Sequence, residues 1–424
     1  MRRLSFAFLS PFLTRLGQRG GFNAHFLAKQ SFTVTASYAI GVLKGIITGY
    51  LVTRLFPQEL YGAYKFALSV VGTVGFMAVP GIVSTLGTQI AKNKMKAPVR
   101  SAMLLYSLWC VIGSFLIAGS IILLPYWDKE SLWLLMVISA ILFVPSNAGV
   151  HIFSATVRGM ERFDRAFYVT TLSNVIQVFG VLLVLWLKPS ALLLLLCTSA
   201  VPSFLYFGYM LWWCREFPSH QSFRPWVRQS INLSLATIPM TLSWYADGLL
   251  ISAYFGLKQL AVLSVALLIP EQIKVWSKEL FPIFYSTQAR GEDSWERRRK
   301  ITKLVGYGTF VAGSGILLYC LITPFVIPFL FPKYNPHDII FLTNIAAVTL
   351  ISTPATLYTQ YLEARGMIRE LQWCNWVSST AYVICLCILV PILGPLGAII
   401  SRGVLRASFA TVGYIALRTI PIKH

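Results

Sequence analysis

The chain has 424 residues, of which 56% are hydrophobic and only 12% are charged, and its net charge is +21. Typical soluble domains contain about 25% charged residues, so this composition excludes a soluble globular protein, which could not cover its surface. Apolar runs long enough to cross a bilayer, roughly 20 residues each, recur along the chain. The composition therefore predicts an all-α polytopic membrane protein.

The apolar runs predict twelve transmembrane helices. Helices are expected rather than barrel strands because the runs are long and do not alternate, and because a lipid-exposed backbone must satisfy its own hydrogen bonds. In chain order we expect them at residues 32–54, 62–90, 99–126, 131–156, 166–187, 190–213, 229–255, 259–287, 302–329, 338–361, 370–391 and 395–418. The breaks between them contain turn and charged residues, as in "FPQELYG" and "ARGEDSWERRRK".

The distribution of lysine and arginine predicts the orientation. If the N-terminus is cytoplasmic, the inside segments hold 25 of these residues and the outside segments hold five. Such a bias places both termini in the cytoplasm. The net charge then reflects retention of the loops beside anionic lipid, so membrane lipids, and no nucleic acid, are the expected partners. Residues 1–29 are expected to form a basic cytoplasmic segment at the membrane interface.

Two copies of the tripeptide Arg-Gly-Met indicate an internal repeat. They lie at residues 158–160 and 365–367, 207 positions apart, and each closes a predicted fourth helix of one half. We therefore expect a six-helix lobe at residues 30–215 and a second one at 229–418. A cytoplasmic linker at 216–228 joins them, and a cytoplasmic tail at 419–424 follows the second lobe. An even number of helices per lobe predicts a pseudo-twofold axis along the membrane normal, a transporter arrangement, with Arg158 and Arg365 at equivalent cytoplasmic positions.

Basic residues inside the predicted helices are the candidate substrate-binding residues. A charged side chain that faces lipid costs roughly 2.5–3.5 kcal/mol, so these residues are expected to line a polar cavity or to form internal salt bridges. Lys65 lies near an outer helix end, where its ammonium group could also reach the interface. The full set is Lys44, Lys65, Lys274, Lys278, Arg402 and Arg406.

Two carboxylates are predicted near the middle of the membrane, on Asp247 and Glu271. Either could carry a coupling proton, and the alternative is that both are counter-ions for neighbouring cations. Glu271 and Lys274 share one helix face at i, i+3, and Arg402 and Arg406 share another at i, i+4.

Three stretches resemble the polysaccharide and oligosaccharide-lipid flippases of the multidrug/oligosaccharidyl-lipid/polysaccharide exporter superfamily. They are "YLVTRLFPQELYGAYKFALSVVGTVGFMAVPGIVSTLGTQIAKNK", "DGLLISAYFGLKQLAVLSVALLI" and "ILGPLGAIISRGV". They are similar to the family's opening signature, to its passage from the seventh to the eighth helix, and to its glycine-rich entry into the last helix. In one departure, the Tyr-Ala-like stretch usual after the seventh helix reads "VLSVALLI" here.

The resemblance implies a transporter in the inner membrane of a bacterium. Its substrate would be an oligosaccharide joined by a diphosphate to a polyprenol, flipped to the outer leaflet for O-antigen, capsule or exopolysaccharide synthesis. Alternating access of two lobes would move it, and the membrane cations would hold the diphosphate by charge-assisted hydrogen bonds. A polysaccharide polymerase and glycosyltransferases are the implied protein partners. We expect a monomer without a catalytic residue, metal or cofactor.

Two other functions fit parts of the sequence. An ion-coupled multidrug antiporter of the same superfamily would favour an acidic, aromatic cavity. Here the six cations inside the predicted helices outnumber three carboxylates, those of Asp247, Glu271 and Glu279. A membrane polymerase or ligase would need a catalytic constellation, usually on a large outside loop, and the predicted outside loops are short. The sequence contains no G-x-x-x-x-G-K-[ST] loop, so transport is expected to be passive, ion-coupled or driven by withdrawal of the substrate.

Overall fold

The computed structural model describes residues 24–120, 130–187, 190–218, 222–280 and 294–419. These residues are helical almost throughout and contain no strand, which confirms the all-α class. Most of the predicted basic segment at 1–29, and much of the basic loop after the eighth predicted helix, lie outside the described residues.

The elements of the first half occupy residues 24 to 216. The bounds are α2 Ala24–Leu55, α3 Gln58–Val74, η2 Gly75–Ala78, α4 Gly81–Asn93, η3 Lys94–Lys96, α5 Val99–Ser120, α6 Glu130–Met160, α7 Phe163–Leu187, α8 Ala191–Leu195, η5 Leu196–Ala200, α9 Val201–Trp213 and η6 Cys214–Glu216.

The elements of the second half occupy residues 224 to 419. The bounds are η7 Arg224–Trp226, α10 Val227–Leu280, α12 Trp295–Leu330, α13 Pro336–Val348, η8 Thr349–Ala355, α14 Thr356–Ala364, α15 Ile368–Leu393 and α16 Pro395–Thr419.

The predicted helices match these elements in order, with breaks inside some of them. The helix expected at 62–90 is divided into α3, η2 and α4, because Pro80 lacks a backbone donor and Val79 adopts a φ of 53°. The helix expected at 338–361 is divided around Pro354 in η8. In α10, Gly256 has a φ of 79° and a ψ of 178°, which separates the two helices expected on either side of it.

Within the described residues, nine helical stretches are long and apolar enough to cross a membrane. The chain is therefore a multi-pass membrane protein. The residues from Arg224 to Lys274 count as one of these stretches although Gly256 divides them. The number twelve, the cytoplasmic termini and the twofold axis stay predictions.

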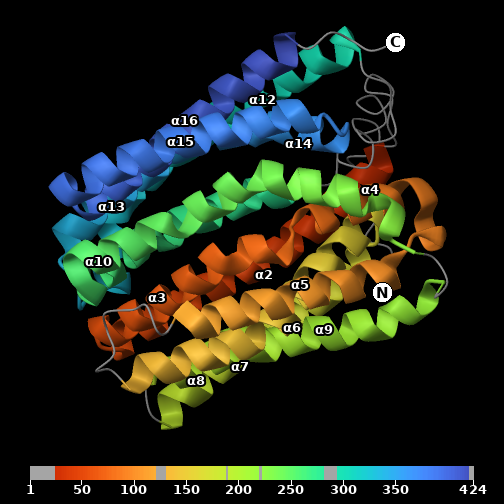
Figure 1. Ribbon diagram of the computed structural model, residues 1–424. Helices are drawn as coiled ribbons and strands as arrows, with labels where there is room; N and C mark the ends of the chain where they lie inside the picture. Colours follow the sequence, from red (N-terminus) through yellow and green to blue (C-terminus); the bar gives the residue numbers. More distant parts are fainter. Residues whose placement is uncertain (1–23, 121–129, 188–189, 219–221, 281–293, 420–424) are drawn as a thin grey trace.

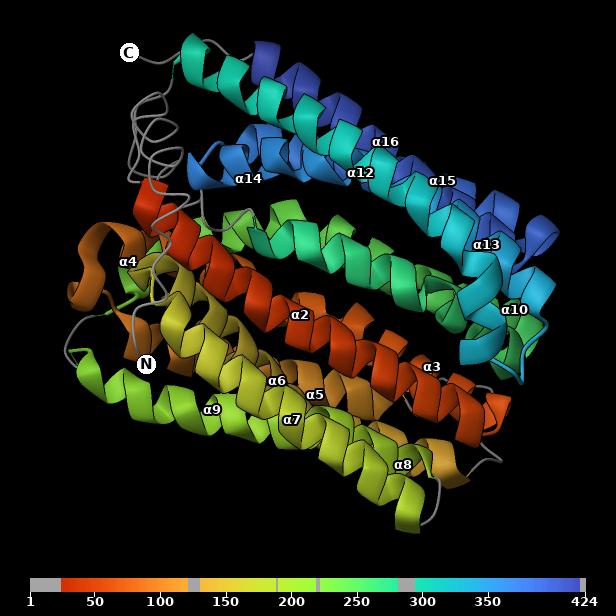
Figure 2. The same cartoon turned by 180° about the vertical axis from the view of Figure 1, so that it is seen from behind.

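Figures 1 and 2 show long helices packed side by side, with α2–α9 on one side of the molecule and α10–α16 on the other. The start of α2 and the end of α16 lie at the same end of the bundle (Figure 2). We call this end, which also carries the α6–α7 and α14–α15 turns, the inner end. The opposite end, with the α2–α3 and α15–α16 turns, is the outer end.

Apolar side chains on the outside of the bundle support a lipid environment. Along α12, Phe310, Leu317 and Phe325 are exposed, whereas Trp213 and Tyr106 are fully buried inside the first half. Exposed apolar surface on this scale is typical of a face that meets a membrane or a partner. The polar groups that matter for function therefore lie between the helices.

Candidate functional site

A cavity of about 700 Å³ lies between the two halves. The first half contributes residues of α2, α6, α7 and α9, and the second half contributes residues of α10, η8, α14, α15 and α16. The lining residues reach from the middle of the helices, at Lys44 and Trp244, to the inner end, at Arg158 and Glu363. None of them comes from the outer helix ends, so the cavity extends toward the inner end.

The lining of this cavity is polar and carries an excess of positive charge. Among the described residues, its lining cations are Lys44, Arg158, Lys274 and Arg406, and the one acidic lining residue is Glu363. The neutral polar lining residues are Ser37, Ser154, Thr170, Asn174, Tyr206, Thr237, Gln272, Ser352, Thr353, Thr356, Thr359, Gln360 and Asn375. Such a surface can bind an anion through the cations and hydroxyl groups of a ligand through the amides and hydroxyls.

Lys44 lies halfway along α2 and has a neutral partner. Its Nζ donates to Oε1 of Gln177 on α7 at 3.0 Å, and the amide of Gln177 donates to Ser173 at 3.1 Å. Among the described residues no carboxylate lies within ion-pair distance of Lys44. Its charge is therefore held in the cavity without a counter-ion.

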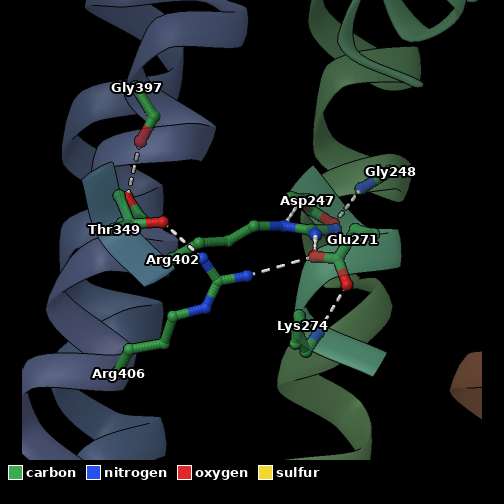
Figure 3. Close-up of polar contacts among 9 residues, drawn as sticks. Asp247, Gly248, Glu271, Lys274, Thr349, Gly397, Arg402 and Arg406 are labelled. Carbon is green, nitrogen blue, oxygen red and sulfur yellow. Dashed lines mark hydrogen bonds and ion pairs between the residues drawn. The ribbon is translucent and has the colours of Figure 1, made fainter. Parts of the chain in front are cut away.

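In the second half, a cluster of five charged residues joins α10 to α16 (Figure 3). Arg402 of α16 binds both carboxylates: its Nε lies 2.5 Å from Asp247 and its Nη1 lies 2.7 Å from Glu271. Asp247 is only 2% exposed and also accepts a hydrogen bond from the backbone N–H of Gly248 at 2.8 Å. Because Asp247 and Glu271 lie on opposite sides of Gly256, Arg402 ties the two arms of α10 together.

The other two cations of the cluster share Glu271 and also line the cavity. Nζ of Lys274 lies 2.6 Å from Glu271 and 3.4 Å from the centre of the Trp244 ring. Nη2 of Arg406 lies 3.1 Å from Glu271, and its Nη1 donates to Thr349. Three cations thus face two carboxylates, and the cluster has a net charge of +1 (Figure 3).

The structure describes the side chains of five of the six predicted cations, and these five lie in three different places. Lys44, Lys274 and Arg406 line the cavity, whereas Arg402 stands behind it and binds the two carboxylates. Both expected arrangements, lining of the cavity and internal salt bridges, therefore occur. Lys274 and Arg406 line the cavity and also form ion pairs.

Lys65 lies away from the cavity. Its ammonium group contacts the rings of Tyr61 and Tyr64 at 5.4 and 5.9 Å from their centres. The side chain of Lys278 lies outside the described residues. Asp247 and Glu271 have the contacts of counter-ions.

Arg158 and Glu363 line the cavity, and the sequence did not single out either one for it. Both lie beyond the predicted helix ends at 156 and 361, in the expected inside loops. The available signal is the i, i+4 spacing of Ser154 and Arg158, which places two polar residues on one face of a helix that continues past 156. The observed helix α6 continues to Met160.

The α6–α7 and α14–α15 turns share one geometry. The N–H of Arg162 donates to the carbonyl of Val157 at 3.1 Å, and the N–H of Met367 donates to the carbonyl of Leu362 at 2.9 Å. Both are the bonds from the sixth residue back to the first that close helices followed by a left-handed residue. Corresponding residues of the two turns are 205 positions apart (162 and 367), whereas the Arg-Gly-Met copies are 207 apart.

This difference of two positions corrects the alignment that we expected. By turn geometry the equivalent of Arg158 is Glu363, and the two residues line the same cavity. The prediction that Arg158 and Arg365 are equivalent is wrong, because the second tripeptide lies two residues further into its turn. Gly159 is helical, whereas Gly366 is the left-handed residue with a φ of 69°.

Solved structures with the same fold are membrane transporters. A multidrug resistance MATE family transporter of the MOP superfamily in its outward-facing conformation is 17% identical, with 93% of this chain and 94% of that chain covered and a TM-score of 0.63. A MATE protein in complex with MaD5 is 13% identical, with the same coverage and a TM-score of 0.66. A MOP superfamily transporter from Pyrococcus furiosus Vc1, described as having a binding pocket of reverse polarity, is 14% identical, again with 93% and 94% covered, at a TM-score of 0.61.

At these identities the likeness establishes the fold, which is that of the MOP superfamily. No curated protein matches the chain. The resemblance noted in the sequence is confirmed by a family match over residues 27–288, which is more than half of the chain. The chain therefore belongs to the family described as polysaccharide biosynthesis protein.

Proposed function

We propose that the protein moves a lipid-linked oligosaccharide across a bacterial inner membrane, for the assembly of a surface polysaccharide such as O-antigen, capsule or exopolysaccharide. The substrate class is an oligosaccharide joined through a diphosphate to a polyprenol. The observation that carries the proposal is the cationic cavity between the halves, which contains Lys44 and in which no described carboxylate lies beside Lys44. Family membership agrees with this pathway.

The charges of the cavity suit a diphosphate. Lys44 approaches from the first half, and Lys274 and Arg406 approach from the second half, so an anion between them would contact both. Hydrogen bonds between ammonium or guanidinium groups and phosphate oxygens are about twice as strong as neutral ones. An excess of cations would also disfavour the cationic drugs expected of a multidrug antiporter.

The neutral lining residues suit a sugar. Asn174 and Tyr206 lie on the first-half side, and Gln272 and Asn375 lie on the second-half side. Amides and hydroxyls both donate and accept hydrogen bonds, which matches the hydroxyl groups of an oligosaccharide. The polyprenol would stay in the bilayer while the polar head crosses between the halves.

Contacts at the outer end fit one state of an alternating-access cycle. Glu59 of α3 forms an ion pair with Lys258 of α10 at 3.4 Å, and the amide of Gln58 donates to the carbonyl of Lys333 at 2.9 Å. These contacts join the halves on the side opposite to the cavity. We propose that they separate when the cavity closes at its inner end and opens outward.

The test uses purified protein in liposomes that contain a fluorescent polyprenyl-diphosphate oligosaccharide. Flipping is read from the fraction of label accessible to an added membrane-impermeant quencher. Lys44→Gln, which removes the charge but retains hydrogen bonding, is expected to reduce the rate by about tenfold or more, because a charge-assisted contact contributes about 1.5–3 kcal/mol. Lys65→Gln, outside the cavity, is the matched control and is expected to flip at the wild-type rate.

An equal rate for the wild type and Lys44→Gln would remove the diphosphate-binding role of Lys44.

The second candidate, an ion-coupled antiporter, is supported by the shared fold with MATE proteins. It is tested in the same liposomes with ethidium as the probe. Ethidium export driven by an imposed proton or sodium gradient, with no flipping of the labelled lipid, would replace the proposed function.

A further inference from the structure

A second, smaller hollow lies beside the cavity at the inner end, and neither the transport proposal nor the family match accounts for it. Its volume is about 260 Å³. It is enclosed by α4 of the first half and by the start of α10 and the α14–α15 turn of the second half. We call it the side pocket. The second Arg-Gly-Met copy forms part of its wall.

The side pocket is lined by cations from both halves. Lys92 of α4 comes from the first half, and Arg365 of the α14–α15 turn comes from the second half. Among the described residues, Glu363, which also lines the main cavity, is the one acidic residue in this lining. The lining therefore has a net charge of +1, and the polar side chains of Thr88 and Gln229 complete it.

A buried hydroxyl in the wall has no hydrogen-bond partner among the described residues. Thr85 is 1% exposed, its Oγ1 makes no hydrogen bond, and it lines the side pocket one helical turn before Thr88. A buried hydroxyl without a hydrogen bond is costly, so the great majority of such groups are satisfied. A ligand in the pocket that reached this hydroxyl would supply its missing partner.

The first turn of α15 adds backbone donors to the same wall. Met367 and Ile368 line the pocket. The N–H of Met367 is bound to Leu362, so the backbone donors at this wall are the N–H groups that follow it, in a first turn that also contains Glu370 and has no side-chain cap hydrogen bond. The first N–H groups of a helix have no partner within the helix and favour an anion there. A cation pair, an unpartnered hydroxyl and a helix start thus converge on one hollow.

We propose that the side pocket is a binding site for a phosphate group, carried either by an anionic lipid or by a small soluble phosphate. The phosphate accepts hydrogen bonds from Lys92, Arg365, Thr85 and the start of α15. Because Lys92 and Arg365 belong to opposite halves, the ligand stabilises the arrangement of the halves seen here relative to arrangements in which they part. The site is separate from the proposed substrate cavity and does not depend on the transported substrate.

Thermal unfolding of the purified full-length protein tests the site, since a ligand that binds only the folded state raises its stability. One arm adds inorganic phosphate to protein in neutral detergent, with sulfate-free chloride buffer at equal ionic strength as reference. The other arm compares nanodiscs of phosphatidylcholine with nanodiscs that contain phosphatidylglycerol. A rise of the unfolding midpoint with phosphate assigns a soluble ligand, and a rise only with phosphatidylglycerol assigns a lipid headgroup.

Two variants connect the rise to the side pocket. Lys92→Gln is expected to weaken the apparent affinity for the probe about tenfold, in line with loss of a charge-assisted contact. Thr85→Val is expected to raise the midpoint without ligand, because it removes an unpartnered buried hydroxyl, and to reduce the further rise with ligand. Matched controls are Lys96→Gln, a neighbouring lysine outside the pocket, and Thr48→Val, another buried hydroxyl without a partner.

The proposal is overturned if neither probe raises the midpoint of the wild type. It is also overturned if a rise occurs and both pocket variants retain it in full, because binding would then lie elsewhere. Loss of the rise in Lys92→Gln and Thr85→Val, with both controls unchanged, supports it. Flipping measured in parallel does not decide the matter, since the site is assigned by binding.

Discussion

The two halves of the chain hold their membrane cations in different ways. In the first half, the side-chain partner of Lys44 among the described residues is the neutral amide of Gln177. In the second half, Arg402 is bound by Asp247 and Glu271 together. A cation without a counter-ion is available to a ligand, whereas a cation between two carboxylates mainly holds helices together. A membrane cation can therefore serve ligand binding in one half and helix packing in the other.

The inner-end turns show the same contrast on one backbone geometry. Both turns close with the same hydrogen-bond pattern, yet Arg158 faces the cavity from one and Glu363 from the other. The left-handed position is Glu161 in the first turn and Gly366 in the second. The two turns thus share a backbone geometry but differ in the charge that they place at the cavity. They also differ in the residue that adopts the left-handed conformation, and therefore in backbone strain. Four predictions test these differences, from the largest expected effect to the smallest.

Arg402→Ala is expected to destabilise the protein most. It leaves the carboxylate of Asp247, which is 2% exposed, with the N–H of Gly248 as its remaining side-chain hydrogen-bond partner among the described residues. Removing one partner of a buried ion pair costs about 3–5 kcal/mol. Membrane abundance by blot and the unfolding midpoint should both fall sharply, and Asp247→Asn in the same chain should recover part of the loss.

Lys44→Gln is the matched variant for this comparison, and it is expected to keep nearly wild-type abundance and midpoint. If Arg402→Ala leaves the midpoint unchanged, or if Lys44→Gln lowers it as much, the contrast between the halves has no energetic basis.

Gly159→Leu is expected to have the next largest effect. A Cβ at Gly159 would lie 2.6 Å from Cβ of Ile90 and 2.9 Å from the carbonyl oxygen of Gly87, so a larger side chain forces α6 away from α4. Overpacking of this kind costs about 1–3 kcal/mol and occasionally more. A midpoint within error of the wild type would show that the α4–α6 contact gives way easily.

Gly366→Ala is expected to cost about 1–2 kcal/mol through the backbone alone, which is the penalty of a left-handed conformation for an L-residue. A Cβ there meets nothing within 4 Å, so no clash contributes. The glycines of the two tripeptides are thus required for different reasons, packing at 159 and conformation at 366. The measurement is the unfolding midpoint, and an effect larger at Gly366→Leu than at Gly366→Ala would contradict the absence of a clash.

The sequence predicted the parts of the structure that follow from local composition. The order of the helices, the break near Gly256 and the presence of Lys44, Lys274 and Arg406 on a polar surface follow from apolar runs and from the cost of a charge in lipid. The break at Pro80 was less clear, because proline is also tolerated inside transmembrane helices when neighbouring groups satisfy the backbone.

The partners of the charged residues could not be predicted in the same way. Arg402 pairs with Asp247 across 155 positions and with Glu271 across 131, and such pairs depend on how three helix segments pack. The alignment of the two turns could not be predicted either. The Arg-Gly-Met match aligns identical residues, whereas the position of the left-handed residue determines where each turn lies. That residue is Glu161 in the first half, which no propensity favours in this conformation.

Glu161→Gly is the smallest expected effect, and it is the sharpest test of the turn comparison. Relief of the left-handed strain is worth roughly 1–2 kcal/mol, and the greater freedom of glycine in the unfolded chain opposes it by about 0.5–1 kcal/mol. The net gain over Glu161→Ala, which removes the same side chain but keeps the strain, is therefore expected near 0.5–1 kcal/mol. Both variants are compared by unfolding midpoint in one detergent. Suppose that Glu161→Gly has a higher unfolding midpoint than Glu161→Ala and that Gly366→Ala lowers the midpoint. Both turns then require a left-handed residue at this position, and only the second half has the glycine suited to it. Equal midpoints for Glu161→Gly and Glu161→Ala would mean that the first turn relaxes around position 161, and the equivalence of positions 161 and 366 would then have no energetic consequence.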